Sequence, residues 1–198
     1  MKSIDITGSL RTETGKKATH ALRKSSQVPC VLYGMKKDEN GLPVATPFTV
    51  TVEGLRKLVY TPHIYVVNLN IDGQVYNAIM KDIQFHPVTD AILHVDFYQI
   101  NEENPIVMEV PVQLDGLAEG VRAGGKLVLQ IRKLKVKALY NNMPERVVIN
   151  VTNLGLGKTI KVGELHYDNM EILNAKEAVV CAVKLTRAAR GAQAAAAK

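Results

Sequence analysis

The sequence predicts a mainly β protein of the α+β class, with a small closed or half-closed sheet in its first half and an all-β second half. Apolar and polar residues alternate along most of the 198 residues, and this is the period of a β-strand. Asp72-Gly73 separates two such runs and predicts a tight hairpin, because both turn positions need a positive φ. Numerous short strands of this kind favour a barrel-like sheet.

Two short helices interrupt the strands of the first hundred residues. Residues 17–25 are good helix formers and end before Pro29, while residues 53–60 end before Pro62. Alternation predicts strands over residues 48–52, 64–71, 75–85 and 91–100. With a strand at the N-terminus and another after the first helix, the predicted order is β-α-β-β-α-β-β-β.

The second half is predicted to be a separate β domain. The polar run 101–105 ends in Pro105 and is interpreted as a linker, which gives domains at 1–100 and 101–185. Strands are predicted at 106–114, 127–139, 147–151, 159–162 and 178–185. Lys133, Lys135 and Lys137 alternate with Leu134, Val136 and Ala138 and therefore share one face. The basic, alanine-rich tail 186–198 cannot build a core, so disorder in isolation is expected.

Positive charge is concentrated at the N-terminus. The formal net charge is +6 and the pI about 9.3, and the cations of residues 1–37 account for the excess. This favours an anionic partner such as nucleic acid or a membrane surface. The sequence begins with no apolar secretory segment and contains no run of 18 apolar residues, so we expect a cytosolic protein. Cys30 and Cys181 are expected to be buried, reduced thiols.

The segment 11–24 is the first candidate site. It reads as a basic loop that enters a helix, and Lys16, Thr19, His20 and Arg23 lie three, four and seven positions apart on one helical face. Cations in this arrangement can neutralise phosphates, and arginine can also bind base edges. We expect Ala18, Ala21 and Leu22 to pack inward. The simpler alternative is a solvated, charged helix.

A second candidate site is formed by residues 81–87 and 94–97. Alternation predicts that Lys81 shares a strand face with Ile83 and Phe85, while Asp82 lies with Gln84. A metal site from His86, His94 and Asp96 is not favoured, because strand spacing defines no ligand geometry. A hydrolytic triad is not favoured either, because no Ser or Cys has a suitable context.

The run 155–159 resembles a phosphate loop, but Thr152 stands where glycine is needed and no helix is expected to follow.

Together these motifs resemble a known family. The matching residues in the first half are Leu10-Arg11, Gly15-Lys16, Ala18-Thr19, Leu22-Arg23, Val28-Pro29, Tyr33-Gly34, Asp82-Ile83-Gln84, His86-Pro87 and His94-Val95-Asp96-Phe97. Those in the second half are Val110-Pro111-Val112, Gly116, Gly120-Val121, Gly124-Gly125, Leu127, Asn153-Leu154 and Gly157. In order and spacing the chain is similar to the 5S-rRNA-binding proteins of the bacterial large ribosomal subunit, the Ctc or general-stress-protein family, in its long two-domain form.

The resemblance implies a ribonucleoprotein component of the translation machinery, located in the cytoplasm on the ribosome. Residues 1–100 would form a six-stranded barrel-like domain that docks on 5S rRNA near its internal loop E. The C-terminal domain would contact neighbouring large-subunit proteins and rRNA. The implied RNA contacts are Arg11, Lys16, Thr19, His20, Arg23, Tyr33, Lys81, Gln84, His94 and Asp96.

Two positions depart from the family pattern. His20 stands where arginine is frequent, and Phe85 stands where a basic or polar residue can occur. We expect no catalytic residue, metal, cofactor, small-molecule substrate or membrane partner. Two alternatives remain: an RNA-processing enzyme that uses His20, His94 and Asp96, and a stress adaptor that binds no RNA. Turnover of a model RNA and co-sedimentation with large subunits separate these hypotheses.

Overall fold

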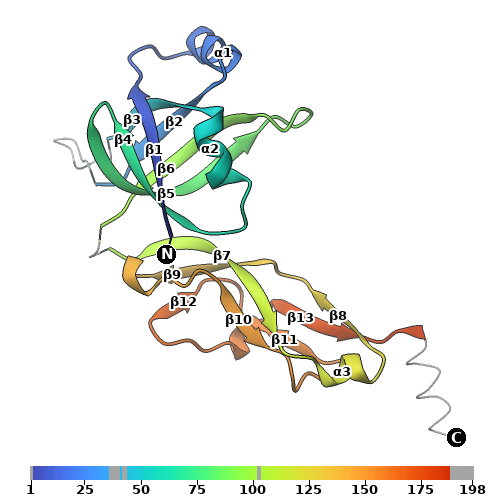
Figure 1. The fold of residues 1–198 in the computed structure, drawn as a ribbon. Helices are drawn as coiled ribbons and strands as arrows, with labels where there is room; N and C mark the ends of the chain where they lie inside the picture. Colours follow the sequence, from blue (N-terminus) through green and yellow to red (C-terminus); the bar gives the residue numbers. More distant parts are fainter. Residues whose placement is uncertain (1, 36–40, 42–43, 102–103, 188–198) are drawn as a thin grey trace, which may run out of the picture. The chain divides into compact units, whose positions relative to one another are not determined.

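The computed structural model describes residues 2–35, 41, 44–101 and 104–187. The chain divides into two compact units, Met1–Asn104 and Pro105–Lys198. Each is mainly β, as the sequence predicts (Figure 1). The predicted linker residues 102 and 103 and the tail from residue 188 onward lie outside the described residues.

The N-terminal unit is a six-stranded closed barrel with two short helices, which confirms the predicted class and element order. Along the chain the elements are β1 (Lys2–Leu10), α1 (Lys16–Lys24), β2 (Gln27–Tyr33), β3 (Thr46–Thr51), α2 (Val52–Val59), β4 (Tyr65–Ile71), β5 (Gln74–Phe85) and β6 (Ile92–Gln99). The barrel order is β1-β3-β2-β6-β5-β4. Parallel pairing of β1 with β4, from Lys2↔Tyr65 to Gly8↔Ile71, closes it.

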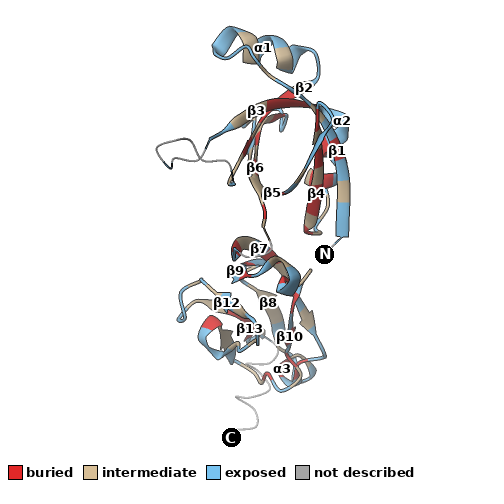
Figure 2. Ribbon diagram, turned by 90° about the vertical axis from the view of Figure 1, so that its left-hand side faces the viewer, coloured by how far each residue is buried: buried red, intermediate tan, exposed pale blue. Residues whose placement is uncertain are grey.

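Buried apolar residues of the strands and of α2 form one core in the barrel. Figure 2 marks buried residues in red along the barrel strands. Phe48 and Phe97 are fully buried, and their ring centroids lie 5.7 Å apart. Helix α2 adds buried Leu55 and Leu58, and the Thr51 hydroxyl caps its N-terminus by accepting from the Gly54 N–H at 3.3 Å. The aromatic pair and α2 thus pack into one core with the strands.

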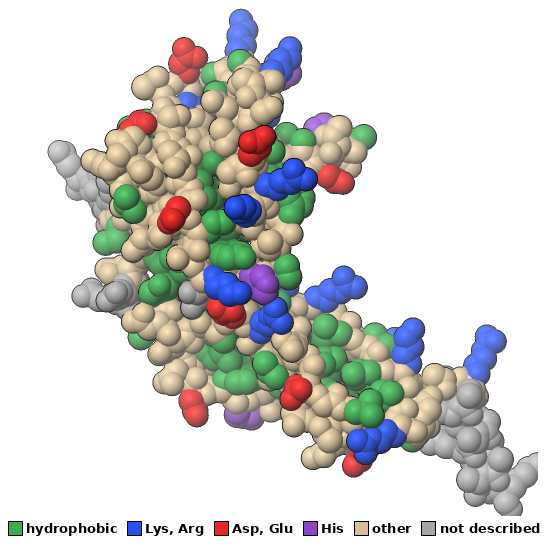
Figure 3. All heavy atoms as spheres, in the orientation of Figure 1, with side chains coloured by type: hydrophobic (Ala, Val, Ile, Leu, Met, Phe, Trp, Pro, Cys, Tyr) green, Lys and Arg blue, Asp and Glu red, His purple; other side chains and the backbone are tan. Residues whose placement is uncertain are grey.

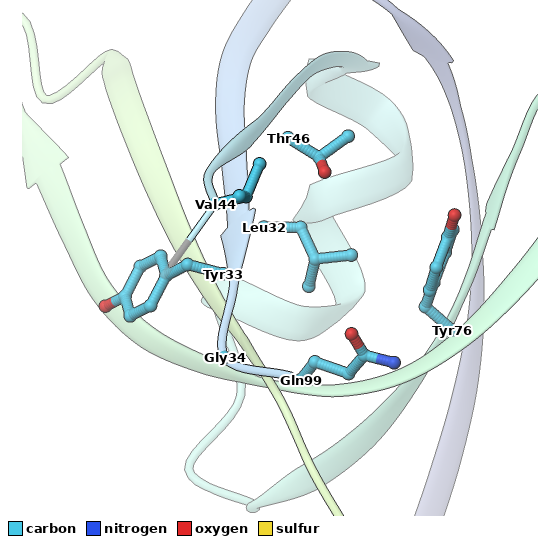
Figure 4. A pocket seen from close by; sticks show the side chains of 7 residues that line it. All are labelled: Leu32, Tyr33, Gly34, Val44, Thr46, Tyr76 and Gln99. Atoms are coloured by element: carbon cyan, nitrogen blue, oxygen red, sulfur yellow. The ribbon is translucent and has the colours of Figure 1, made fainter. Parts of the chain in front are cut away.

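Two turns depend on unusual backbone angles. Asp72 and Gly73 both have positive φ, 48° and 89°, which confirms the predicted tight hairpin between β4 and β5. Gly34 follows β2 at φ 139°, and a Cβ there would lie 2.9 Å from the Gln99 carbonyl oxygen. This close approach borders a pocket lined by Leu32, Tyr33, Gly34, Val44, Thr46, Tyr76 and Gln99 (Figure 4).

The C-terminal unit contains two sheets. Its elements are β7 (Ile106–Asp115), α3 (Glu119–Arg122), β8 (Lys126–Leu129), β9 (Lys133–Ala138), the 3₁₀ helix η1 (Tyr140–Asn142), β10 (Val147–Asn150), β11 (Thr159–Lys161), the 3₁₀ helix η2 (Val162–Glu164), β12 (Met170–Ile172) and β13 (Val179–Lys184). One sheet has the order β10-β7-β9-β12, and the other has the order β11-β13-β8. The run 155–159 leads into strand β11, so the interpretation as a turn between strands is confirmed.

The predicted single strand 127–139 is wrong. It is two strands, β8 and β9, which belong to different sheets. Between them the N–H groups of Gln130 and Ile131 both donate to the Val180 carbonyl, at 2.8 and 3.2 Å. These bonds turn the chain out of one sheet and into the other, although the apolar pattern continues through the turn. The short elements α3 and β12 were also not predicted.

Within the part of the chain that is described, no helix is both long and apolar enough to cross a membrane.

Replacing Phe48 by alanine should lower the free energy of unfolding of the N-terminal unit by about 3–5 kcal/mol, because a fully buried ring is lost from a closed core. Denaturant unfolding of the full chain, followed by circular dichroism, measures this. Phe85→Ala is the matched control, since that ring is 41% exposed, and should cost less than about 1 kcal/mol. Equal losses would contradict the described core.

Candidate nucleic-acid interface

Helix α1 begins with an open N-terminus. Its N-cap residue is Gly15 at φ 102°, which has no capping side chain, and the first turn contains no acidic residue. Free N–H groups at a helix start attract anions. Lys16, His20 and Arg23 are exposed on one edge of the helix, where Lys, Arg and His side chains gather (Figure 3). The Thr19 hydroxyl donates back to the carbonyls of Gly15 and Lys16 at 3.0 and 3.1 Å, so its proton is used inside the helix.

Helix α1 packs weakly against the barrel. None of its nine residues is buried; Ala18 and Leu22 are half-buried, and Ala21 is exposed. The expectation that all three pack inward is therefore wrong for Ala21, because only one narrow edge of the helix contacts β2. A helix of this length is marginal on its own in water. Its position must depend on a few specific contacts.

Arg23 provides such a contact. Its Nε and Nη2 atoms donate to the Leu93 carbonyl oxygen at 3.1 and 3.0 Å. In the ladder between β5 and β6, Gln84 pairs with His94 and Phe85 with Ile92, so Leu93 is an extra residue in a β-bulge. The last turn of α1 is thereby joined to β6, directly before His94. Arg23, predicted as an RNA contact, also fixes the helix.

A second bulge changes the predicted direction of Lys81. The register passes from Met80↔Phe97 to Asp82↔Asp96, which leaves both Lys81 and Asp82 opposite Asp96. Met80 and Ile83 pack against the core, and both residues between them are exposed. The prediction that Lys81 shares a face with Ile83 is therefore wrong. The bulge leaves the Lys81 side chain exposed, opposite Asp96 in the register.

His94 and Asp96 form a pair on the outer face of β6. His94 Nδ1 lies 2.7 Å from Asp96 Oδ1, and the two side chains are 25% and 34% exposed. A carboxylate that accepts from Nδ1 fixes the ring orientation and leaves Nε2 for another partner. Gln84 of β5 is exposed and in register with His94, so its amide lies on the same face. Three polar side chains with donors and acceptors thus share this part of the sheet.

Tyr33 continues this face onto β2. Parallel pairing places Tyr33 in register with Tyr98, and the rings meet edge to face with centroids 5.9 Å apart. Burial raises the pKa of the Tyr33 hydroxyl, and the carboxylates of Asp96 and Asp82 raise it further, so the group stays a donor. Tyr98 and Asp82 were not among the predicted residues. Strand alternation could have identified both, because it places Asp82 on the same face of β5 as Gln84 and Tyr98 on the same face of β6 as Asp96.

Arg11 follows β1 and is half-buried. Its Nε and Nη1 atoms are buried without a hydrogen-bond partner among the described residues. Its charge and that of Asp96 both act on the buried thiol of Cys30, whose pKa burial raises from 9.0 to about 12. The Asp96 charge raises this pKa, and the Arg11 charge lowers it. Arg11 and Asp96 therefore lie near the same core residue.

The metal and hydrolytic hypotheses find no support in the geometry. His86 Nδ1 accepts from the N–H groups of Val88 and Thr89, at 3.3 and 3.2 Å, within its own turn. In the described segments no three His, Cys, Asp or Glu side chains are grouped as metal ligands. His20 lies on α1 and not on the strand of the His94–Asp96 pair.

Known proteins match both units. The model of the ribosomal L25p family matches residues 6–97, and that of the C-terminal domain of ribosomal protein TL5 matches residues 105–187. A protein of Phocaeicola vulgatus named large ribosomal subunit protein bL25 is 78% identical over 198 residues, covering all of both chains. The chain belongs to the ribosomal L25p family. Proteins of the same name from Bacteroides fragilis and Porphyromonas gingivalis are 66% and 56% identical, covering 100% and 97% of each chain.

Family membership confirms the resemblance read from the sequence, including the long two-domain form. The protein is a ribosomal protein with a structural role and is not an enzyme. The RNA-processing alternative, which relied on His20, His94 and Asp96, is therefore excluded. The individual RNA contacts remain predictions.

Replacing Arg23 by alanine should loosen α1 without unfolding the barrel, because the helix loses its link to the Leu93 carbonyl. Backbone amides of α1 should exchange with solvent roughly tenfold faster, as expected for a lost charge-assisted hydrogen bond. Hydrogen exchange measured by mass spectrometry or NMR reports this. Lys24→Ala, which removes the neighbouring exposed cation, is the control. It should change the exchange of the α1 amides less than about twofold. Similar exchange in both variants would argue against the anchoring role.

Proposed function

We propose that this protein is a structural constituent of the large ribosomal subunit, in the cytoplasm, and that its N-terminal unit binds 5S rRNA. The interface consists of α1 together with the outer faces of β2, β5 and β6. The observation that carries the proposal is the bond from Arg23 to the Leu93 carbonyl. It brings a cationic helix beside the polar residues Gln84, His94 and Asp96.

The two parts of this interface suit the two parts of an RNA surface. The open N-terminus of α1, with Lys16, His20 and Arg23, offers donors and positive charge to phosphates. Gln84, His94 and Tyr33 offer hydrogen-bonding groups that can reach base edges and 2′-hydroxyls, which A-form RNA exposes in a wide, shallow minor groove. Asp96 can accept from an exocyclic base amine or orient His94. Phosphate contacts position a protein, and base contacts make it selective.

Three lines support 5S rRNA as the partner. The relatives are named as large-subunit proteins, the chain shares their family over its whole length, and the sequence resembles the 5S-rRNA-binding members. Lys81 and Arg11 would add positive charge on either side of the polar face. The stress-adaptor alternative explains neither the family nor this arrangement. We assign the 5S contact to the barrel domain and contacts with neighbouring ribosomal elements to the C-terminal unit.

The proposed base-reading role predicts the effect of Gln84→Ala. Binding of the full chain to 5S rRNA should weaken by about 1–3 kcal/mol, the range for a good bidentate base contact, while binding to a scrambled duplex changes little. Dissociation constants at one fixed salt concentration measure both. Gln130→Ala is the matched control, because Gln130 is an exposed glutamine of the C-terminal unit. Equal losses on both RNAs, or for both variants, would rule out a selective site at Gln84.

The phosphate-binding role predicts a salt dependence. Arg11, Lys16, His20, Arg23 and Lys81 imply three to five neutralised phosphates, so the log–log salt slope for 5S rRNA should be about −2 to −4.5. Lys16→Ala should reduce its magnitude by about 0.7–0.9, whereas Lys135→Ala in the other unit should change it little. Titrations between about 50 and 200 mM salt give the slopes. A slope near zero would contradict the electrostatic part of the proposal.

A further inference from the structure

Three of the six strand lysines in the described part of the C-terminal unit have a carboxylate beside them or directly opposite in the ladder. Lys161 Nζ lies 2.7 Å from a Glu177 oxygen, and Lys137 Nζ lies 3.8 Å from a Glu171 oxygen. Lys135 of β9 is in direct register with Glu109 of β7. The positive charge on the lysine face of β9 is therefore partly offset by the carboxylates of Glu109 and Glu171. Paired charges of this kind attract a polyanion weakly.

At one end of the three-stranded sheet, two lysines face each other instead of a carboxylate. Lys184, the last residue of β13, is directly opposite Lys126, the first residue of β8, and both are exposed. Directly opposed side chains of an antiparallel pair have Cβ atoms about 4.5–5.5 Å apart, and two like charges there oppose pairing. Within the described part of the chain, neither lysine forms a salt bridge. The fold thus accepts a local repulsion at this position.

Further cations extend this end of the sheet. The Thr186 hydroxyl donates to the Gly124 carbonyl at 2.6 Å, which holds the chain after β13 against the turn between α3 and β8. Arg187 follows and is exposed, and Arg122 is exposed in the last turn of α3. The nearest acidic residue along α3 is Glu119, in its first turn. Lys and Arg side chains are visible over this end of the unit in Figure 3.

We propose that Lys126, Lys184 and Arg187, here called the β8–β13 patch, form a second RNA-binding surface that contacts the phosphate backbone. The patch lies on a different unit from the proposed 5S rRNA interface and does not depend on it. Two lysines on one face, held by a strand ladder, can neutralise neighbouring phosphates, and this would offset their mutual repulsion. Lysine acts on phosphate as a point charge, and contacts to the phosphate backbone carry no sequence information. Binding should therefore be insensitive to sequence.

The test uses the full chain and a labelled A-form RNA duplex unrelated to 5S rRNA. Lys126→Gln with Lys184→Gln removes two charges, so the magnitude of the salt slope should fall by about 1.4–1.8 and affinity near 0.1 M salt roughly tenfold or more. Removing the repulsion should leave the melting temperature unchanged or raised. The Lys126→Arg, Lys184→Arg variant keeps both charges and should bind as the natural protein does.

The matched control is Lys133→Gln with Lys135→Gln, two exposed strand lysines of the same unit. This pair should change the salt slope by less than half as much as the patch variant. Equal changes in the two glutamine variants, or no change in the patch variant, would overturn the proposal. The proposal would also be overturned if the patch variant lost binding to anionic lipid vesicles but kept its RNA binding, because the patch would then bind a membrane surface.

Discussion

Closure of the barrel by the parallel pairing of β1 with β4 is the constraint on which the N-terminal unit depends. Once Lys2 to Gly8 lie beside Tyr65 to Ile71, every strand has two neighbours, and the interior must be filled by alternate side chains. Phe48 and Phe97 fill it together with the aliphatic residues around them. A closed, filled barrel leaves only its outer surface for polar contacts, and it holds that surface rigidly.

The candidate interface is built from two departures from regular pairing on this rigid surface. The bulge at Leu93 leaves a carbonyl that accepts from Arg23, and the bulge at Lys81 leaves an exposed lysine opposite Asp96. Bulges are known to re-aim side chains next to functional sites. The helix contributes charge but little packing, so the strands determine where that charge lies. A weakly packed helix on a rigid sheet can also adjust to a partner at small cost.

The sequence predicts most of the fold because its signals are local. Asp72-Gly73 defines a hairpin, Pro29 and Pro62 limit two helices, and alternation identifies the strands of both units. The failures arise where distant residues decide. The break at Gln130 and Ile131 depends on the Val180 carbonyl, about fifty positions away, and nothing in the local pattern marks it. The prediction of the strand face of Lys81 fails for the same reason, because a bulge depends on the pairing of two strands and alternation describes only one.

The candidate residues, by contrast, rest mainly on a family resemblance. The geometry adds contacts within the protein for five of them: Thr19, Arg23, Tyr33, His94 and Asp96.

The pairing that closes the barrel also has a consequence for synthesis of the chain. Asp5 of β1 and Asn68 of β4, which share a hydrogen bond, are 63 positions apart. Strand β2 likewise pairs with β6, which is synthesised much later. At roughly 5–20 residues per second, the first strand emerges several seconds before its partner exists. During that interval β1 has an open edge, and non-local contacts of this kind form slowly. The charged N-terminal residues Lys2 and Asp5 and the early glycine Gly8 should reduce aggregation of the nascent strand before the barrel closes.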